Sequence, residues 1–268
     1  MTRVLVTGGS RGIGLAVATD LAEHGVELLL VARDADTLTA AAESLPGSGH
    51  VTHAFDVSDE AAWQSVQVDE LNGLVCAAGV MDPIGATGSY AVSTFRRTLD
   101  INVVGTLLAV QHCLPALRAT GGSIVTGGGG GATGPLPNFD AYAASKAAVA
   151  RLTENLAIEL APLRVNCIAP GFVVTRLHDA TLAAGPEAAG PEFFERTRQT
   201  VEEGGFPASD AAELVRLLVL DPEFTGKLVS AQWDPWRDPA YRKRLATDPD
   251  LGTVRRIDGV LYGRLEDV

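Results

Sequence analysis

The N-terminal stretch places a glycine-rich turn between a strand and a helix, and this order restricts the chain to few folds. Residues 3–7, RVLVT, are typical of a short buried strand, and residues 15–23 are typical of a helix. Between them stands Gly8-Gly-Ser-Arg-Gly-Ile-Gly14, whose glycines let a bound group approach the backbone closely. A helix start also offers unpaired N–H groups and a favourable dipole to phosphate. With a second strand predicted over residues 27–31, the sequence indicates a nucleotide-binding βαβ unit.

A second feature lies in residues 137–162, where a run rich in Ala, Leu and Val predicts a helix of about five turns. Asn138 and Asp140 are its candidate N-terminal caps. Tyr142 and Lys146 are four residues apart, so they share one face of the helix. A nearby ammonium group is expected to lower the pKa of a phenol from about 10 and make it a general acid or base. The alternative is a surface pair without chemistry, and the independent glycine turn favours the chemical interpretation.

The residue after the second strand of such a unit usually selects the nicotinamide cofactor. An acidic side chain there binds the ribose 2′-hydroxyl and repels a 2′-phosphate, but this chain has Ala32 and Arg33 at that place. Together with Arg11 in the glycine turn, Arg33 can make charge-assisted hydrogen bonds to a 2′-phosphate. We therefore expect NADP(H) to be preferred over NAD(H), the alternative being two exposed arginines.

Four landmarks in this order resemble those of the single-domain short-chain dehydrogenases/reductases. Residues from Thr7 to Gly14 match the TGxxxGxG turn of that family, and Cys76-Ala-Ala-Gly79 is a variant of its NNAG turn. Asn102 matches the active-site asparagine, and Tyr142 with Lys146 matches the catalytic pair. The resemblance covers nearly the whole chain and implies a single Rossmann-like domain over residues 1–268, a doubly wound parallel sheet of about seven strands with helices on both faces.

The resemblance also implies roles for individual residues. Tyr142 would donate or accept the proton, and Asn102 would hold a water that relays protons to Lys146, which would also bind the nicotinamide ribose. A threonine after the sixth strand, Thr175 here, would hold the nicotinamide carboxamide. The cofactor-binding residues that we expect are Gly8, Ser10, Arg11, Gly12, Ile13, Gly14, Arg33, Asp56, Val57, Ala78, Gly79, Tyr142, Lys146, Pro170, Gly171, Val173 and Thr175.

One position departs from the family pattern. Relatives usually carry a serine thirteen residues before the tyrosine, where it hydrogen-bonds the substrate carbonyl, and this chain has Gly129 there. Backbone N–H groups of residues 127–131 are one replacement for the missing hydroxyl. Another is a side chain from Thr126, Thr133 or Asn138, and a third is a bulkier substrate that fills the vacated volume. We expect the glycine to be purposeful.

Two segments lie outside the common core of the fold. Residues 176–206 occupy the place of the family's substrate lid, and His178, Phe193 and Phe194 are candidates to line the pocket or to pack as ordinary core residues. Residues 232–268 form an atypical C-terminal tail, too short for a second domain. Its apolar anchors are expected to pack on their own subunit or on a neighbour; they are Trp233, Trp236 and Tyr241.

Charge and composition exclude several classes of partner. The chain has 21 basic against 33 acidic residues, a formal net charge of −12, which opposes binding to nucleic acid or to an anionic membrane. No signal peptide is evident, and no apolar run approaching the roughly 20 residues of a membrane span is expected. Three scattered cysteines suit reduced thiols and a cytoplasmic location. No metal-ligand spacing occurs among the five histidines.

These observations predict NADP(H)-dependent interconversion of a carbonyl and an alcohol on a small molecule. Because Gly129 replaces the serine, a non-redox reaction in the same pocket, such as dehydration, epimerisation or cyclisation, is the alternative. A catalytically inactive, cofactor-binding regulator is the third interpretation. The two long helices predicted over residues 92–118 and 141–161 pack across a subunit two-fold axis in relatives, so we expect a homodimer or homotetramer.

Overall fold

Seven parallel strands form one sheet in the order β3-β2-β1-β4-β5-β6-β7, as predicted for a doubly wound α/β fold. The computed structural model describes residues 2–255. The strands are β1 (Arg3–Thr7), β2 (Glu27–Ala32), β3 (Val51–Ala54), β4 (Gly73–Cys76), β5 (Ser123–Gly127), β6 (Arg164–Ala169) and β7 (Leu228–Ser230). The chain order of the strands reverses between β1 and β4, so loops at their carboxyl ends diverge and leave a crevice there.

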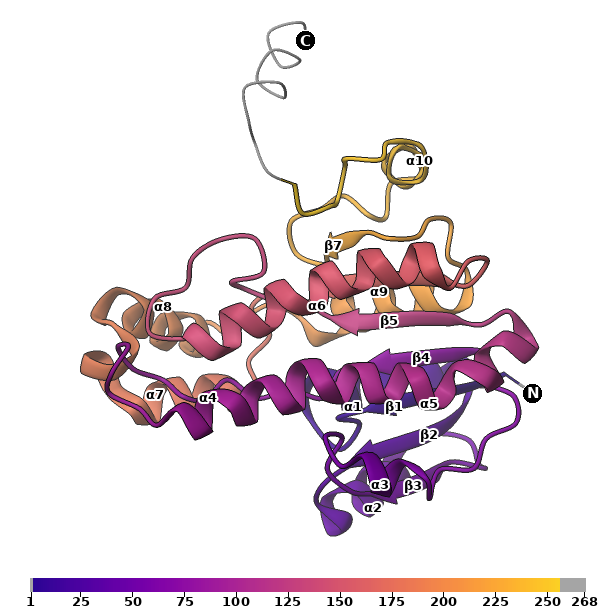
Figure 1. Ribbon diagram of the computed structural model, residues 1–268, viewed down its shortest axis with the longest axis horizontal. Helices are drawn as coiled ribbons and strands as arrows, with labels where there is room; N and C mark the ends of the chain where they lie inside the picture. The colour runs from indigo at the N-terminus through magenta and orange to yellow at the C-terminus, as the bar shows by residue number, and fades with distance from the viewer. Residues whose placement is uncertain (1, 256–268) are drawn as a thin grey trace, which may run out of the picture.

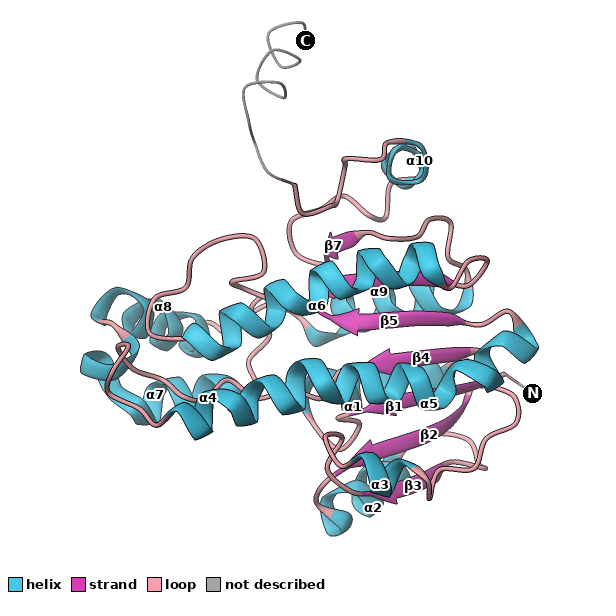
Figure 2. Ribbon diagram, in the orientation of Figure 1, coloured by secondary structure: helices cyan, strands magenta, loops and turns pink. Residues whose placement is uncertain are grey.

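Helices cover both faces of the sheet. They are α1 (Gly12–Glu23), α2 (Ala35–Ser44), α3 (Glu60–Trp63), α4 (Val92–Leu99), the π-helical turn η1 (Asp100–Val104), α5 (Gly105–Thr120), α6 (Asp140–Glu159), α7 (Arg176–Ala189), α8 (Pro191–Glu202), α9 (Ala208–Leu220) and α10 (Pro239–Thr247). In Figure 1, α5 and α6 cross the near face of the sheet, whereas α1 and α9 lie behind it. The strand arrows in Figure 2 point towards the side where α7 and α8 lie, so these two helices stand over the carboxyl ends of the strands.

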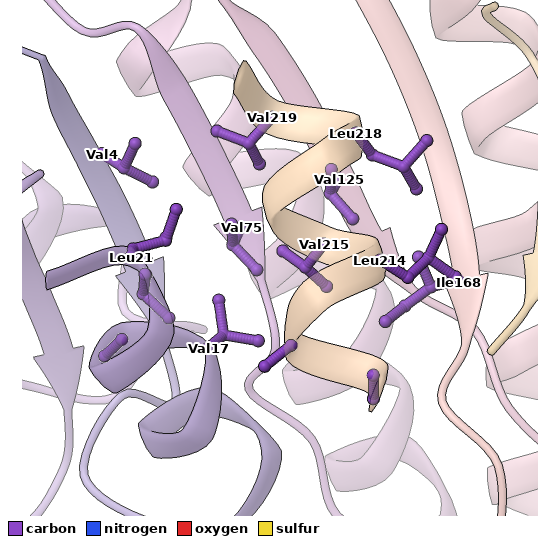
Figure 3. Packing of buried hydrophobic residues seen from close by; sticks show 14 of the residues in the cluster. Val4, Val17, Leu21, Val75, Val125, Ile168, Leu214, Val215, Leu218 and Val219 are labelled. Carbon is purple, nitrogen blue, oxygen red and sulfur yellow. The ribbon is translucent and has the colours of Figure 1, made fainter. Parts of the chain in front are cut away.

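The side chains of alternate strand residues pack into two hydrophobic cores, one on each face of the sheet. Val4 and Val6 of β1 pack with α1 and α9, whereas Leu5 between them packs on the side of α5 and α6. All three are fully buried, as expected for parallel strands covered on both faces. Figure 3 shows the first core, in which Val17 of α1 and Val215 of α9 meet the strands. The sheet is therefore a rigid platform for the loops that leave its carboxyl edge.

The N-terminus of α6 differs from the prediction. The cap residue is Phe139, and no side chain caps the helix. The Asp140 carboxylate instead accepts hydrogen bonds from Thr87 and from Tyr90, each at 2.6 Å. Asn138 takes a left-handed conformation with φ of 69° and does not cap the helix either. The capping prediction was wrong because Asp140 is engaged by a loop that lies distant in sequence.

The predicted helix over residues 92–118 runs from Val92 to Thr120 and contains the π-helical turn η1. By length and composition alone it passes as a membrane span, contrary to the expectation that no run approaches that length. This is weak evidence, because buried helices of protein interiors pass the same test. Ala109 and Cys113 of α5 pack without exposure in the core that includes residues of β4 and β5. This part of the helix is therefore a wall of the core.

The segment predicted as a lid is mostly helical. It contains α7 and α8, and glycine residues mark its breaks: Gly185 has φ of 79° inside α7, and Gly190 precedes α8 with φ of 82°. Left-handed φ values favour glycine, which explains why the sequence shows Gly-Pro pairs at both places. The two helices pack against each other over the site that is described below.

Up to Arg255, the tail packs in part on the rest of the chain. Trp236 is buried, and its indole N–H donates to the carbonyl of Ala231 at 3.0 Å. The buried ammonium group of Lys227 donates to the carbonyl groups of Asp248 and Leu251, at 2.6 and 2.8 Å. Trp233, by contrast, is 78% exposed. The rest of the predicted tail, residues 256–268, lies outside the described residues.

Candidate active site

The glycine turn after β1 is folded so tightly that two of its positions admit no side chain. A Cβ atom on Gly14 would lie 2.2 Å from the carbonyl oxygen of Gly8. A Cβ atom on Gly8, where φ is 70°, would lie 2.8 Å from the amide nitrogen of Ala78. The turn after β1 and the turn after β4 therefore touch through their backbones, directly at the point where the strand order reverses.

A cleft of about 470 Å³ opens beside this contact, within the usual size range of ligand sites. Helix α1 begins at its wall, and the cap residue Arg11 makes no side-chain bond to the helix start, which leaves the first N–H groups of α1 available to an anion. The cleft thus fits a dinucleotide with a pyrophosphate at the turn. Most of the predicted cofactor-binding residues line it: Gly8, Ser10, Arg11, Gly12, Ile13, Gly14, Arg33, Asp56, Val57, Ala78, Gly79 and Thr175.

The outer end of the cleft carries both signs of charge. The Arg33 side chain is 62% exposed and lies 4.0 Å from the Asp56 carboxylate. Asp56 is already occupied, because Arg97 and the Ser58 hydroxyl both donate to it. Burial alone would raise the pKa of Asp56, but the Ser58 hydrogen bonds and the charge of Arg97 lower it below the ordinary value. With Asp56 satisfied elsewhere, Arg33 remains open towards a ligand beside Arg11.

The inner end of the cleft adjoins a small cavity of about 80 Å³ that Tyr142 and Lys146 line together with Pro170. Gly79 and Leu177 line both spaces, so the two are neighbours. The Lys146 ammonium group donates to the carbonyl of Gly127 at 2.8 Å and lies 5.5 Å from the centre of the Tyr142 ring. The structure thus brings the predicted pair to the inner end of the predicted cofactor cleft.

The sequence predicted a lowered pKa for Tyr142, and in the polypeptide alone this direction is wrong. Burial raises the pKa of Tyr142 to about 12, and burial lowers the pKa of Lys146 to about 8. Each side chain is only 8% exposed, so loss of hydration disfavours the charged form of both groups. The Lys146 ammonium group is bonded to a carbonyl rather than to the phenol. Desolvation therefore outweighs the attraction on which the sequence-based prediction relied.

Asn102 joins the two halves of the site. Its side-chain oxygen accepts from the Val80 amide at 2.9 Å, and its amide group donates to the Val80 carbonyl at 2.9 Å and to the Ser145 hydroxyl at 2.8 Å. Ser145 in turn donates to the carbonyl of Tyr142 at 2.7 Å. Asn102 lies in the π-helical turn η1, which separates α4 from α5. The asparagine thereby fixes the loop after β4 against the first turns of α6.

The side chains of Asn102 and Lys146 also both lie close to Gly79. A Cβ atom on Gly79 would lie 3.3 Å from the Asn102 side-chain oxygen and 3.6 Å from the Lys146 nitrogen. The water relay implied by the resemblance stays a prediction. Ser145 was not singled out from the sequence, although its place inside the Tyr142–Lys146 motif, on the inner face of α6, was a signal that could have identified it.

Gly129 lies against the tyrosine hydroxyl. Its φ is 151°, and a Cβ atom there would lie 2.6 Å from the Tyr142 oxygen. Thr126 does not replace the missing serine, because its buried hydroxyl pairs with that of Thr153 at 2.6 Å. Asn138 faces the lid, since its amide nitrogen lies 2.8 Å from the Cβ position of Gly190. Thr133 is exposed, and the Gly128 N–H already donates to the carbonyl of Ile168 at 2.8 Å. The group closest to the Cβ position of Gly129 is therefore the Tyr142 hydroxyl itself.

Two predicted cofactor residues lie in neither cavity. Val173 is buried in the core shared with α1 and α9. Gly171 has φ of 83°, and a Cβ atom there would lie 2.8 Å from the Phe206 ring, so this glycine shapes the loop after β6. Among residues 2–255, no group of three or more His, Cys, Asp or Glu side chains is placed to hold a metal ion.

An apolar cluster covers Tyr142 from the side of the lid. Phe193 of α8 packs on Phe139 with ring centres 4.7 Å apart, as one of the two sequence interpretations expected. His178 stacks on Phe172 at 4.2 Å and bonds the cap residue Thr175, so it organises the start of α7. The members of the cluster are Met81, Ile84, Leu136, Phe139, Tyr142, Leu177, Ala189, Phe193 and Phe194.

The fold and the site together define a Rossmann-type protein with Tyr142 and Lys146 at the inner end of a cleft that fits a dinucleotide. The model of the short chain dehydrogenase family matches residues 2–184, and the chain belongs to this family. A pig protein, dehydrogenase/reductase SDR family member 4, is 35% identical over 182 residues, which are 64% of this chain and 65% of that protein. The chain therefore spans just under two thirds of this relative's length.

Solved structures agree with this assignment. An NAD⁺-bound xylitol dehydrogenase is 27% identical with a TM-score of 0.75, covering 85% of this chain and 96% of the other. An actinorhodin polyketide ketoreductase solved with NADPH is 26% identical with a TM-score of 0.75, covering 85% and 95%. These relatives are named as dehydrogenases or reductases, and the two structures contain different nicotinamide cofactors.

The lowered pKa of Lys146 predicts a specific pH dependence of stability. Between about 8 and the ordinary value of 10.5, the unfolded chain holds a proton that the folded protein has released. The free energy of unfolding therefore increases as pH rises through this window, so the folded protein becomes more stable. Measured by chemical denaturation between pH 7 and 10, the native protein should gain about 2 kcal/mol relative to Lys146→Met. The control Lys243→Met replaces an exposed lysine, and its free energy of unfolding should change with pH as that of the native protein does. If the free energy of unfolding of Lys146→Met followed the same pH dependence as the native protein, the lowered pKa of the buried amine would be contradicted.

Proposed function

We propose that the protein is an NADP(H)-dependent oxidoreductase that interconverts a carbonyl and an alcohol on a small molecule. The observation that carries this proposal is the placement of Tyr142 and Lys146 in a cavity that adjoins the dinucleotide cleft. Family membership supports redox chemistry of this class. The apolar cluster around Tyr142 favours a substrate that is largely apolar near its reacting carbon.

The side chains have separate tasks in this proposal. The bound nicotinamide supplies or accepts the hydride, and the protein handles the proton. Because burial raises the pKa of Tyr142 to about 12, its hydroxyl is protonated at neutral pH and is ready to donate to a carbonyl oxygen. Lys146 holds positive charge beside the phenol and favours the phenolate that forms when the proton leaves. Asn102 and Ser145 position this part of α6 through their hydrogen bonds.

A non-redox reaction in the same pocket is the second candidate, and Gly129 is the observation that favours it. Without a serine hydroxyl, the site has one donor fewer for a developing oxyanion than its relatives usually have. A dehydratase, epimerase or cyclase would turn over substrate without net change in cofactor. Stoichiometric oxidation of NADPH during turnover therefore separates the two candidates.

The cofactor preference rests on the residues at the outer end of the cleft. Arg11, Ala32 and Arg33 line it, and neither Ala32, the last residue of β2, nor Arg33, the residue after it, is acidic. Such a site offers charge-assisted hydrogen bonds to a 2′-phosphate and lacks the usual carboxylate partner for a ribose 2′-hydroxyl.

The double variant Ala32→Asp, Arg33→Ala should therefore reverse the preference. We expect the native protein to bind NADPH about tenfold or more tightly than NADH, and the variant to bind NADH more tightly, because a carboxylate repels the 2′-phosphate and accepts from the ribose hydroxyl. Fluorescence or calorimetric titration measures both affinities. A native protein that prefers NADH would refute the assignment.

Removal of the tyrosine hydroxyl separates chemistry from cofactor binding. Tyr142→Phe should lower kcat by at least about 100-fold, because the proton donor is lost, while the dissociation constant for NADPH changes little. Tyr241→Phe removes a hydroxyl from the tail and serves as the matched control with near-native kcat. Near-native turnover of Tyr142→Phe would exclude this tyrosine from the reaction and favour the non-redox candidate.

The contact between Gly129 and Tyr142 makes a further prediction. In Gly129→Ser, the new side chain must displace the tyrosine hydroxyl, and its backbone must hold a left-handed φ, so activity should fall by about tenfold or more. Gly130→Ser is the matched control, because a Cβ atom there meets no atom within 4 Å. If Gly129→Ser instead raised the rate of carbonyl reduction, the glycine would be a degraded serine position and not a purposeful one.

A further inference from the structure

The first turn of the lid helix α7 forms part of the cofactor cleft. Thr175, Arg176, Leu177 and Ala180 line this cleft opposite the glycine turn. The contact is close, since a Cβ atom on Gly12 would lie 3.3 Å from the methyl carbon of Thr175. The start of the lid therefore stands directly over the turn that is shaped for a pyrophosphate.

Arg176 places a positive charge where the helix itself disfavours one. It is the first residue of α7, and the N-terminus of a helix carries the positive end of the dipole. Within residues 2–255, neither Arg176 nor Arg11 forms an ion pair, although acidic residues outnumber basic ones in this chain. Both guanidinium groups also act on Asp34, whose pKa is lowered mainly by hydrogen bonds from Thr37 and to a smaller degree by these two charges.

A bound anion would explain both the position of Arg176 at a helix start and the lack of ion pairs at Arg11 and Arg176 among the described residues. Arg11 comes from the glycine turn, Arg33 from the end of β2 and Arg176 from the lid, and all three line the same cleft. The group with the matching chemistry is a phosphate of the dinucleotide, which a guanidinium binds with two parallel hydrogen bonds. An anion at this place also offsets the unfavourable position of Arg176 against the dipole of α7.

We propose that Arg176 is a phosphate-binding residue for the cofactor, carried by the lid, and that this contact holds the first turn of α7 over the cleft. The proposal rests on the function proposed above, in which the cleft binds NADP(H). It extends that function by assigning a contact to a residue that neither the motifs nor the family pattern singled out.

Leu177 gives this contact a consequence at the catalytic end. It follows Arg176 in the chain, lines both the cleft and the inner cavity, and packs in the apolar cluster around Tyr142. An arginine fixed on the cofactor therefore also fixes the side chain that closes the space beside the tyrosine. Cofactor binding and the shape of the substrate site are coupled through one turn of helix.

Titration calorimetry with NADPH and with NADH tests the binding role in four proteins. These are the native protein, Arg176→Ala, Arg176→Lys and the control Arg118→Ala, which removes an exposed arginine at the end of α5, outside the cleft. Arg176→Ala should bind NADPH about tenfold more weakly, Arg176→Lys should recover part of the loss, and Arg118→Ala should bind as the native protein does. An equal loss for NADH assigns the contact to the pyrophosphate, whereas a loss confined to NADPH assigns it to the 2′-phosphate.

Hydrogen exchange of the lid tests the coupling without any turnover. Saturating NADPH should slow amide exchange over residues 176–189 in the native protein and in Arg118→Ala, but much less in Arg176→Ala. Unchanged affinity of Arg176→Ala for both cofactors, or full protection of the lid in that variant, would overturn the inference and leave the proposed function intact. Failure of the native protein to bind either cofactor would overturn both.

Discussion

The backbone contact between the turn after β1 and the turn after β4 is the constraint on which the site depends. Gly8 has no side chain because the Ala78 amide occupies that volume, and Gly14 has none because the Gly8 carbonyl does. The close contact lets the two loops diverge immediately afterwards, so the cleft opens at the reversal of strand order. A larger residue at Gly8 would push apart the turns after β1 and β4, whereas a larger residue at Gly14 would clash with the Gly8 carbonyl within the glycine turn itself.

From this contact, hydrogen bonds lead to α6, the helix that carries Tyr142 and Lys146. The loop after β4 continues to Val80, whose two backbone groups are both bonded by Asn102, and Asn102 reaches Ser145 and through it the carbonyl of Tyr142. Each partner is buried or half-buried, so a broken link would leave a polar group without water. The position of the tyrosine is thus determined by the same loop that shapes the cleft. The cleft and Tyr142 are held by one network of hydrogen bonds.

Much of this architecture could be predicted from the sequence, because local patterns specify it. Glycine spacing, apolar strand runs and the four-residue separation of Tyr142 and Lys146 need no knowledge of distant contacts. The errors about the helix cap and about the tyrosine pKa both involve such contacts. Asp140 does not cap its helix because Thr87 and Tyr90, more than forty residues earlier in the chain, bind its carboxylate. The direction of the Tyr142 pKa shift depends on desolvation by everything that packs around it, which no spacing reveals.

The raised pKa of Tyr142 is informative about the direction of proton transfer. A buried phenol that stays neutral is a good donor to a carbonyl oxygen, but it is a poor base towards an alcohol until positive charge is brought close. Lys146 can supply that charge only while it is protonated, and burial lowers its pKa to about 8. At neutral pH the folded protein therefore favours a neutral phenol on Tyr142 and, because the Lys146 pKa of about 8 lies above that pH, a protonated Lys146. Under the proposed function, this combination suits Tyr142 as a proton donor, with Lys146 as the positive charge that favours the phenolate as it forms.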